Sequence, residues 1–340
     1  MRPKELKQTL KILVEKGSNP DKEICSLFIG GPPGIGKSRI VEDTAKECGV
    51  QMIDIRLLLC DPSDLRGIPI PFTNGDGKPT ARWIPPDDLP TSGRGILFFD
   101  DFLTAPPLVQ GSAYQLTIRP HRLGNYQLPT GWVVVAASNR VADRALVHRM
   151  PTALANRFIH VELEENIDDW SKWALAQQKP LTEPDIIAFL RWRPELLFKF
   201  DADSAERAFP SPRSWDFTSR IIQSFTKSQW PELLIGTIGK GAAAEFLSFL
   251  KVQKELPDLN EIFKGSNEVP TKVSLKYALC SALVVRAKPD QFERLVQYSF
   301  HLPQEFSVLL VNMLQAKNME ALATCPTIRK WSQENQDVIL

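Results

Sequence analysis

The sequence lacks a long apolar run. No stretch of its 340 residues approaches the roughly 18 uncharged apolar residues that a membrane-spanning helix needs. Residues 1–7 contain no apolar segment of the kind found in secretion signals. We therefore expect neither a transmembrane helix nor a signal peptide in this sequence.

Closely spaced cysteines are also missing. The five cysteines are far apart, no C-x-x-C pair occurs, and the four histidines are scattered. This spacing argues against disulfides and against a structural zinc site. We expect most of the cysteines to be small buried side chains in a reducing cytosol, and hence a cytoplasmic protein.

A strong excess of one charge is absent as well. The 41 basic and 40 acidic residues leave a net charge of +1, which argues against a basic nucleic-acid surface over the whole chain. A local basic patch is compatible with this balance. Apolar residues make up 43% and charged residues 24%, which is typical of a soluble globular protein, and the length allows two or three domains.

What the sequence does contain is a glycine-rich loop at residues 31–38, which matches the pattern G-x-x-x-x-G-K-[ST]. An apolar run at 24–29 predicts a strand before it, and the spacing over 38–48 predicts a helix after it. Glycines let successive N–H groups point at one phosphate, Lys37 reaches the β- and γ-phosphates, and Ser38 binds Mg²⁺. The alternative, a Gly/Pro turn with an incidental lysine, does not explain this strand–loop–helix setting.

Two carboxylates close the next apolar strand, at residues 95–101. Ligands of open α/β sheets bind beyond the carboxyl ends of the strands. Asp100 can hold Mg²⁺ there, usually through water and opposite Ser38, and Asp101 can orient or deprotonate the water that attacks the γ-phosphate. The structural alternative for the Asp-Asp pair is a solvated turn or a helix N-cap.

A further strand at residues 132–139 ends in Asn139. An amide beside the γ-phosphate can position water without adding charge. The alternative is an asparagine that caps a turn.

The remaining patterns predict a βα alternation followed by helices. Continuous apolar strands that alternate with helices indicate a parallel sheet with helices on both faces. Strand signals fade after about residue 165, and the rest is mostly helical with breaks at prolines. The other expected elements are a helix at 4–16, a strand at 51–59, a hairpin-bearing insertion at 61–94, a helix at 106–118, a small hairpin at 119–131, a helix at 143–156 and a strand at 159–163.

Two arginines are candidates for stabilising the charge that develops in phosphoryl transfer. Arg157 follows the helix predicted at 143–156, and Arg213 begins a later helix. Taken alone, each would be a surface or ion-pairing residue. Their assignment depends on the family pattern.

In order and type, these motifs resemble those of the AAA+ ATPases and, within them, the MoxR group. The resemblance covers about residues 20–225. Residues 31–38 are similar to the Walker A motif, 98–101 to Walker B, 105–116 to the MoxR helix after Walker B, 122–132 to the hairpin before sensor 1, 135–140 to sensor 1, 153–158 to the arginine-finger segment and 210–215 to the sensor 2 segment.

The resemblance implies the fold class and the domains. The fold is α/β, a P-loop AAA+ parallel sheet flanked by helices, followed by an α-helical lid and a further helical C-terminal region. The implied domains are a nucleotide-binding core at 1–165 that contains the insertion at 61–94, a lid at 166–250 and a helical extension at 251–340. Residues 251–340 lie outside the resemblance.

It also implies the site residues, with ATP and Mg²⁺ as cofactors. Asp101 and Asn139 would act on the attacking water, Arg157 would be a finger supplied to the neighbouring subunit, and Arg213 would be the sensor 2 arginine. Ser38 and Asp100 would hold the metal. The nucleotide-binding residues would be Gly31, Pro32, Pro33, Gly34, Ile35, Gly36, Lys37, Ser38 and Arg39.

One position departs from the family, because AAA+ proteins usually carry Glu where Asp101 stands. The side chain of Asp is one methylene shorter, so its carboxylate reaches the water less well. Slow or partner-dependent hydrolysis is the expected consequence.

By the resemblance, the chain is an ATP-hydrolysing homo-oligomeric ring, usually a hexamer, which remodels a partner protein. The partner of MoxR relatives often carries a von Willebrand factor A domain. One alternative is a nucleic-acid-associated ATPase of the restriction or transposition type, and another is an ATP-gated scaffold with slow hydrolysis. The residues that could contact nucleic acid phosphates are Arg119, His121, Arg122, Arg140, Arg144 and Arg149.

Overall fold

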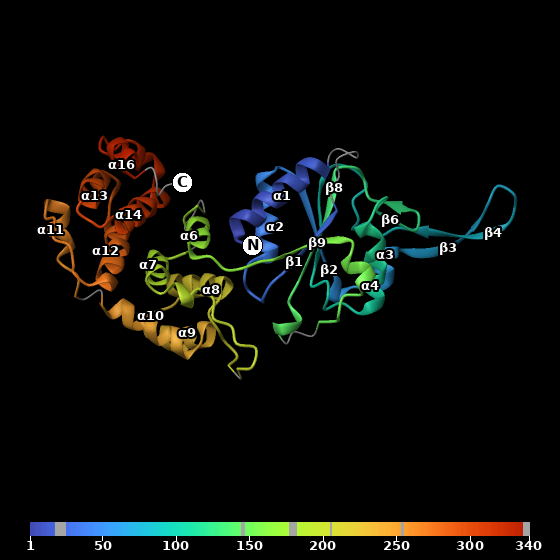
Figure 1. Cartoon of the computed structure of the whole chain (residues 1–340), viewed down its shortest axis with the longest axis horizontal. Helices are drawn as coiled ribbons and strands as arrows, with labels where there is room; N and C mark the ends of the chain where they lie inside the picture. Colours follow the sequence, from blue (N-terminus) through green and yellow to red (C-terminus); the bar gives the residue numbers. More distant parts are fainter. Residues whose placement is uncertain (18–24, 144–146, 177–181, 205, 253–254, 336–340) are drawn as a thin grey trace. The chain divides into compact units, whose positions relative to one another are not determined.

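The computed structural model describes residues 1–17, 25–143, 147–176, 182–204, 206–252 and 255–335. They form two compact units (Figure 1). The first is Met1–Glu165 with Asp201–Asp203, and the second is Asn166–Phe200 with Ser204–Leu340. No helix within these described ranges has the length and apolar character required to cross a membrane.

The first unit is built on a five-stranded sheet in which all neighbouring strands are parallel. The order across the sheet is β2 (Gln51–Arg56), β5 (Gly95–Asp100), β8 (Trp132–Ser138), β1 (Ser26–Gly30) and β9 (Phe158–Glu162). The three inner strands are buried almost throughout, as expected for a sheet covered on both faces. Because the strands are parallel, Gly30, Asp100 and Ser138 all lie at the same edge of the sheet.

Helices cover both faces of this sheet (Figure 1). On one face, α1 (Pro3–Gly17) and α2 (Lys37–Glu47) share a buried cluster with Leu27 and Ile29 of β1. On the other face, α4 (Pro107–Ala113) shares a cluster with Phe28 of β1. Successive strand residues point to opposite faces, so one short apolar strand contributes to both cores. The predicted P-loop α/β class is confirmed.

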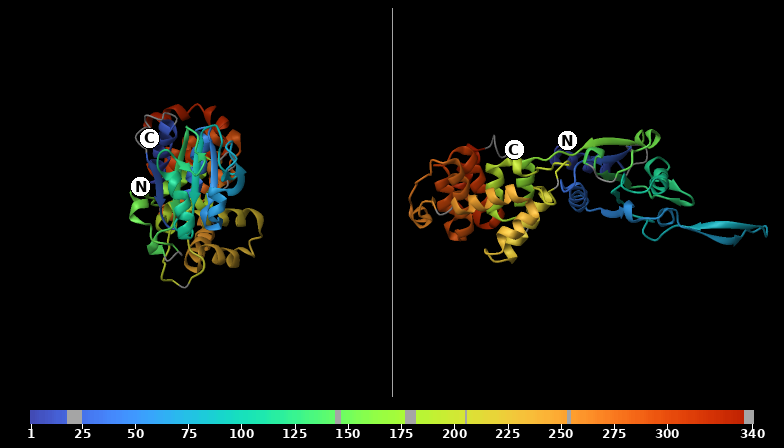
Figure 2. Two further views of the ribbon diagram at one scale, coloured as in Figure 1. Left: turned by 90° about the vertical axis from the view of Figure 1, so that its right-hand side faces the viewer. Right: turned by 90° about the horizontal axis from the view of Figure 1, so that it is seen from below.

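Two antiparallel hairpins extend the first unit. After α3 (Pro62–Arg66), strands β3 (Ile68–Thr73) and β4 (Pro79–Ile84) pair with each other, and Figure 2 shows this hairpin reaching away from the sheet. The side chain of Asn74 accepts hydrogen bonds from the N–H groups of Asp76 and Lys78 and so closes the turn. The second, shorter hairpin consists of β6 (Arg122–Leu123) and β7 (Tyr126–Gln127).

The predicted helix at 143–156 is wrong in the part that the structure describes. Val141–Asp143 is a 3-10 turn, residues 147–150 have no regular structure, and α5 is only Thr152–Ala155. The cause is Pro151, which cannot donate a helical hydrogen bond and forces the residue before it toward an extended backbone. Residues 144–146 lie outside the described residues.

Other predicted boundaries differ by a few residues. The strand expected at 51–59 ends at Arg56 and continues as a 3-10 turn, Leu57–Leu59. The helix expected at 106–118 divides into α4 and a second 3-10 turn, Tyr114–Thr117. The first strand begins at Ser26, and residue 24 of the predicted run is outside the described residues.

The second unit is helical in its described residues, as predicted for the C-terminal region. Its α-helices are α6 (Ile167–Leu175), α7 (Pro184–Trp192), α8 (Pro212–Ser224), α9 (Trp230–Ile238), α10 (Lys240–Val252), α11 (Leu259–Lys264), α12 (Val273–Arg286), α13 (Phe292–Ser299), α14 (Gln304–Lys317), α15 (Met319–Ala323) and α16 (Ile328–Glu334).

One hydrophobic core runs through these helices. Phe189 of α7 contacts the rings of Trp215, Phe246 and Phe249, with centroid distances of 5.1–5.7 Å. The same cluster includes residues of α12 and α14. The division of the helical region into a lid and an extension at residue 250 remains a prediction.

Candidate nucleotide-binding site

The glycine-rich loop connects β1 to α2 and has a backbone that only glycine adopts readily. Gly34 has φ 80° and Gly36 has φ 106°, both in the left-handed region. Gly36 is the N-cap of α2, so the free N–H groups and positive dipole end of an 11-residue helix begin directly after it. This geometry fits an anion at the loop.

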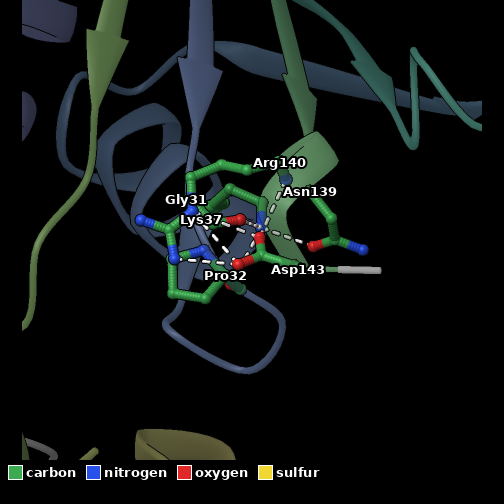
Figure 3. A network of polar contacts seen from close by, with 6 residues as sticks. All are labelled: Gly31, Pro32, Lys37, Asn139, Arg140 and Asp143. Carbon is green, nitrogen blue, oxygen red and sulfur yellow. Dashed lines mark hydrogen bonds and ion pairs between the residues drawn. The ribbon is translucent and has the colours of Figure 1, made fainter. Parts of the chain in front are cut away.

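Lys37 lies in this loop with 8% of its surface exposed. Its Nζ donates to the carbonyl oxygens of Gly31 at 2.6 Å and Pro32 at 3.1 Å. It also donates to Oδ1 of Asn139 at 2.9 Å, and Asn139 follows β8 (Figure 3). The structure therefore brings together the predicted phosphate-binding lysine and the predicted water-positioning amide from separate strands.

A second pair joins the loop helix to β5. Ser38 Oγ donates to Oδ2 of Asp100 at 2.7 Å. A hydroxyl and a carboxylate at this separation are the oxygen ligands that Mg²⁺ prefers, and a Mg²⁺ site at a nucleotide takes further oxygens from phosphates and water. Within the described residues, no group of three or more His, Cys, Asp or Glu side chains could hold a metal ion. The Ser38 hydroxyl and the Asp100 carboxylate fit a Mg²⁺ ion that phosphates and water would also coordinate.

Asp101 has an unusual backbone. Its φ is 53°, in a region that few non-glycine residues adopt, although aspartate tolerates it better than most. Its N–H donates to Oδ1 of Asp100 at 3.0 Å, and its carbonyl accepts from Thr104 and Ala105. The chain thus leaves the sheet in a sharp turn directly after Asp100.

Asp54 of β2 is an acidic residue near this site that the sequence analysis missed. Its pKa is raised, first by burial and then by the negative charges of Asp100 and Asp101, which the nearby Arg56 partly offsets. The available signal was an aspartate between two isoleucines in a predicted strand.

The residue after Asn139 is held by a second missed aspartate. Asp143 accepts from the Arg140 N–H at 2.8 Å and from the Arg140 guanidinium at 2.8–3.2 Å (Figure 3). The Asp143 side chain is 3% exposed and that of Arg140 is 43% exposed. Pairing with this carboxylate raises the pKa of Arg140. The pair fixes the turn that carries Asn139.

Arg157 lies between α5 and β9, and the described contacts of its side chain are with Tyr114. The recorded hydrogen bonds and ring contacts of the described residues do not join Arg157 to the glycine-rich loop. Arg213 is exposed in the first turn of α8, in the second unit, and so belongs to a different unit from the loop. Arg39 is exposed on α2 and pairs with Glu42 and Asp43.

Comparisons with known proteins find similarity only at a low level. Neither a protein-family model nor a curated protein matches the sequence. A variant of RuvB from Thermotoga maritima is 14% identical, with a TM-score of 0.41, over 96% of this chain and 87% of that one.

Two other solved structures are similar at the same level. A putative ATPase from Cytophaga hutchinsonii is 14% identical with a TM-score of 0.34, over 98% of this chain and 88% of that one. NtrX from Brucella abortus is 12% identical with a TM-score of 0.38, over 95% of this chain and 67% of that one. Because these values are low, the functional argument rests on the residues of this chain.

Proposed function

We propose that this chain binds and hydrolyses ATP as an AAA+ motor of the MoxR type. The observation that carries the proposal is a pair of hydrogen bonds, Lys37 to Asn139 at 2.9 Å and Ser38 to Asp100 at 2.7 Å. They connect residues 102 and 62 positions apart in the sequence. A glycine-rich turn with an incidental lysine has no reason to gather these partners.

Each of these residues has a role in binding the triphosphate. Lys37 exchanges its carbonyl partners at Gly31 and Pro32 for phosphate oxygens, which bind its charge more strongly. Ser38 and Asp100 would hold Mg²⁺, and the ion would neutralise charge on the phosphates. The N–H groups at the start of α2 contribute further donors.

The hydrolytic step uses residues that directly follow β5 and β8. Asp101 orients the attacking water or accepts its proton, and Asn139 holds that water by hydrogen bonding. Arg157 stabilises the charge on the phosphate bound by a neighbouring subunit, and Arg213 is the sensor 2 arginine by the resemblance. These assignments come from the family resemblance and from the position of each residue in its element.

The binding step is tested by Lys37→Ala, with Lys46→Ala as the matched control. Lys46 lies on the same helix, is 64% exposed and pairs with Glu42. Titration with a fluorescent ATP analogue should show a large loss of affinity for Lys37→Ala and wild-type affinity for the control. Wild-type affinity for the ATP analogue in both variants would show that the glycine-rich loop does not bind the nucleotide.

Turnover is tested by steady-state phosphate release from the wild type and from Asp101→Glu. We expect slow release by the wild type and faster release by the variant, because the longer acid reaches the water better. No release from either protein would favour the ATP-gated scaffold. Slower release by the variant would indicate a site adjusted to the shorter acid.

Assembly into a ring follows from Arg157 acting in trans. Arg157→Ala should keep ATP binding and lose turnover, whereas Lys37→Ala should lose binding. Mixing the two variants should restore part of the activity, because an intact loop then meets an intact arginine. Sedimentation with and without ATP measures the size of the assembly.

The proposed substrate of the motor is a partner protein, and we expect that partner to contain a von Willebrand factor A domain. Of the residues named for the nucleic-acid alternative, Arg140 already pairs with Asp143, and Arg144 lies outside the described residues. A DNA-binding titration over a range of salt separates the two. Affinity that falls steeply with salt supports nucleic acid, and no binding at low salt supports remodelling.

A further inference from the structure

The guanidinium of Arg157 lies over the ring of Tyr114. Its Cζ is 3.5 Å from the ring centroid, and its Nη1 lies 3.5 Å from the Tyr114 carbonyl oxygen. Both residues are partly buried. A cation at this distance from an aromatic face is attracted by the negative charge of the ring face. The contact therefore restricts a side chain that would otherwise sample many rotamers.

Stacking on the Tyr114 ring does not occupy the N–H donors at the edge of the Arg157 guanidinium. The N–H donors of a guanidinium lie in its plane, so a ring that covers one face does not occupy the donors at the edge. An arginine held in this way keeps its charge for an anion on another molecule, together with the donors that do not face the Tyr114 carbonyl. A salt bridge to a carboxylate would instead compete with that anion.

Tyr114 is itself attached to the end of β5. The carbonyl of Asp101 accepts from Thr104 and Ala105, and the buried Gln110 side chain donates to the Ala105 carbonyl at 2.9 Å. Gln110 lies in α4, and Tyr114 is the C-cap of that helix. The backbone at Tyr114 is therefore connected through α4 to the turn that follows β5.

The neighbouring segment is tied to the same turn. The N–H of His148 donates to the carbonyl of Leu103 at 2.7 Å, three residues before Pro151 begins the turn into α5. Tyr114, His148 and Leu154 also line one pocket of about 290 Å³. Both sides of the Tyr114–Arg157 contact are thus anchored to the segment after Asp101.

We propose that Tyr114 is a positioning residue for Arg157, holding its guanidinium ready for the phosphate bound by the neighbouring subunit. The proposal rests on the trans role given to Arg157 above. Tyr114 acts through Arg157 and does not touch the nucleotide.

The test compares Tyr114→Leu, Tyr114→Phe, Arg157→Ala and the double variant Tyr114→Leu/Arg157→Ala in the full-length protein. We expect Tyr114→Leu to lower kcat roughly tenfold with little change in KM for ATP. The reason is that Tyr114 orients Arg157, and Arg157 acts on the charge that develops in the transition state rather than on ATP binding. Tyr114→Phe keeps an aromatic face and should retain wild-type turnover. The double variant should be no slower than Arg157→Ala alone.

Four results would overturn the proposal. They are an unchanged kcat in Tyr114→Leu, an equal loss in Tyr114→Phe, a rise in KM that accounts for the loss, and a double variant whose loss is the product of the two single losses. If Tyr114→Leu does not fold, Tyr114→Met makes the same comparison with a more adaptable side chain. Wild-type turnover in Arg157→Ala would reject the trans role as well, whereas a defect confined to Arg157→Ala rejects only the role of Tyr114.

Discussion

Replacement of Asp143 by alanine should destabilise the first unit. The buried carboxylate accepts the Arg140 N–H at 2.8 Å, and loss of a hydrogen bond to a charged group costs about 1.5 kcal/mol. The ion pair adds only about 0.5 kcal/mol, because the Arg140 side chain is 43% exposed and its charge is screened by water. The free energy of unfolding should therefore fall by about 2 kcal/mol.

Asp143→Asn separates the two contributions. Its amide oxygen still accepts the backbone N–H, while the ion pair with Arg140 is lost. The expected loss is then about 0.5–1 kcal/mol. Asp76→Ala, an exposed aspartate at the β3–β4 turn, is the control and should leave stability unchanged within error.

The assay is calorimetric unfolding of the full chain, in which ATP identifies the transition of the first unit by raising its midpoint. A loss of about 2 kcal/mol lowers the midpoint of a domain of this size by about 4–8 °C. Equal losses in the alanine and asparagine variants would refute the importance of the backbone hydrogen bond. An unchanged midpoint in Asp143→Ala would refute the argument altogether.

Three further predictions follow from contacts elsewhere in the chain. Gly36→Ala should lower the free energy of unfolding by about 1–2 kcal/mol and weaken ATP binding, because an alanine is strained at a φ of 106°. A clash is not the cause, since no atom lies within 4 Å of the added Cβ. Normal ATP binding in a titration would contradict this prediction. Lys317→Met should cost about 2–3 kcal/mol, because Lys317 Nζ donates to three carbonyls at the end of α12 at 2.6–3.0 Å; an unchanged urea midpoint for the second unit would exclude this. Asp54→Asn should stabilise the first unit in the absence of Mg²⁺. The pKa of Asp54 is higher in the folded protein than in the unfolded chain. The wild type should therefore lose stability relative to the variant as the pH rises from about 4 through that raised pKa. The same pH dependence of stability in the two proteins would refute this prediction.

Much of the first unit could be predicted from local patterns. The apolar run before the glycine-rich loop, the run before Asp100 and the run before Asn139 each became an inner strand of the sheet. Such strands are recognisable because a sheet covered on both faces needs apolar residues at nearly every position. The hairpin turn at Asn74 was also visible, since Asn and Gly favour tight turns.

Other features depended on contacts between distant segments. The helix expected across Pro151 did not form, because the stop signal of the proline outweighs the apolar spacing around it. Asp143 was predicted only as the first residue of a helix, and the structure instead places it in a turn that buries its carboxylate against Arg140. Tyr114 had no recognisable role before the fold brought Arg157 onto its ring.

The sequence by itself determined the phosphate-loop motif, the parallel α/β class and the helical C-terminal region, because each depends on residue types at short, fixed spacings. Only the tertiary structure decided that Lys37 meets Asn139, that Ser38 meets Asp100 and that Asp54 adds a third carboxylate nearby. The reason is the order of the strands. Hydrophobic periodicity states that a strand is buried, but it does not state which strand lies beside it, and that neighbour decides which side chains meet at the edge of the sheet.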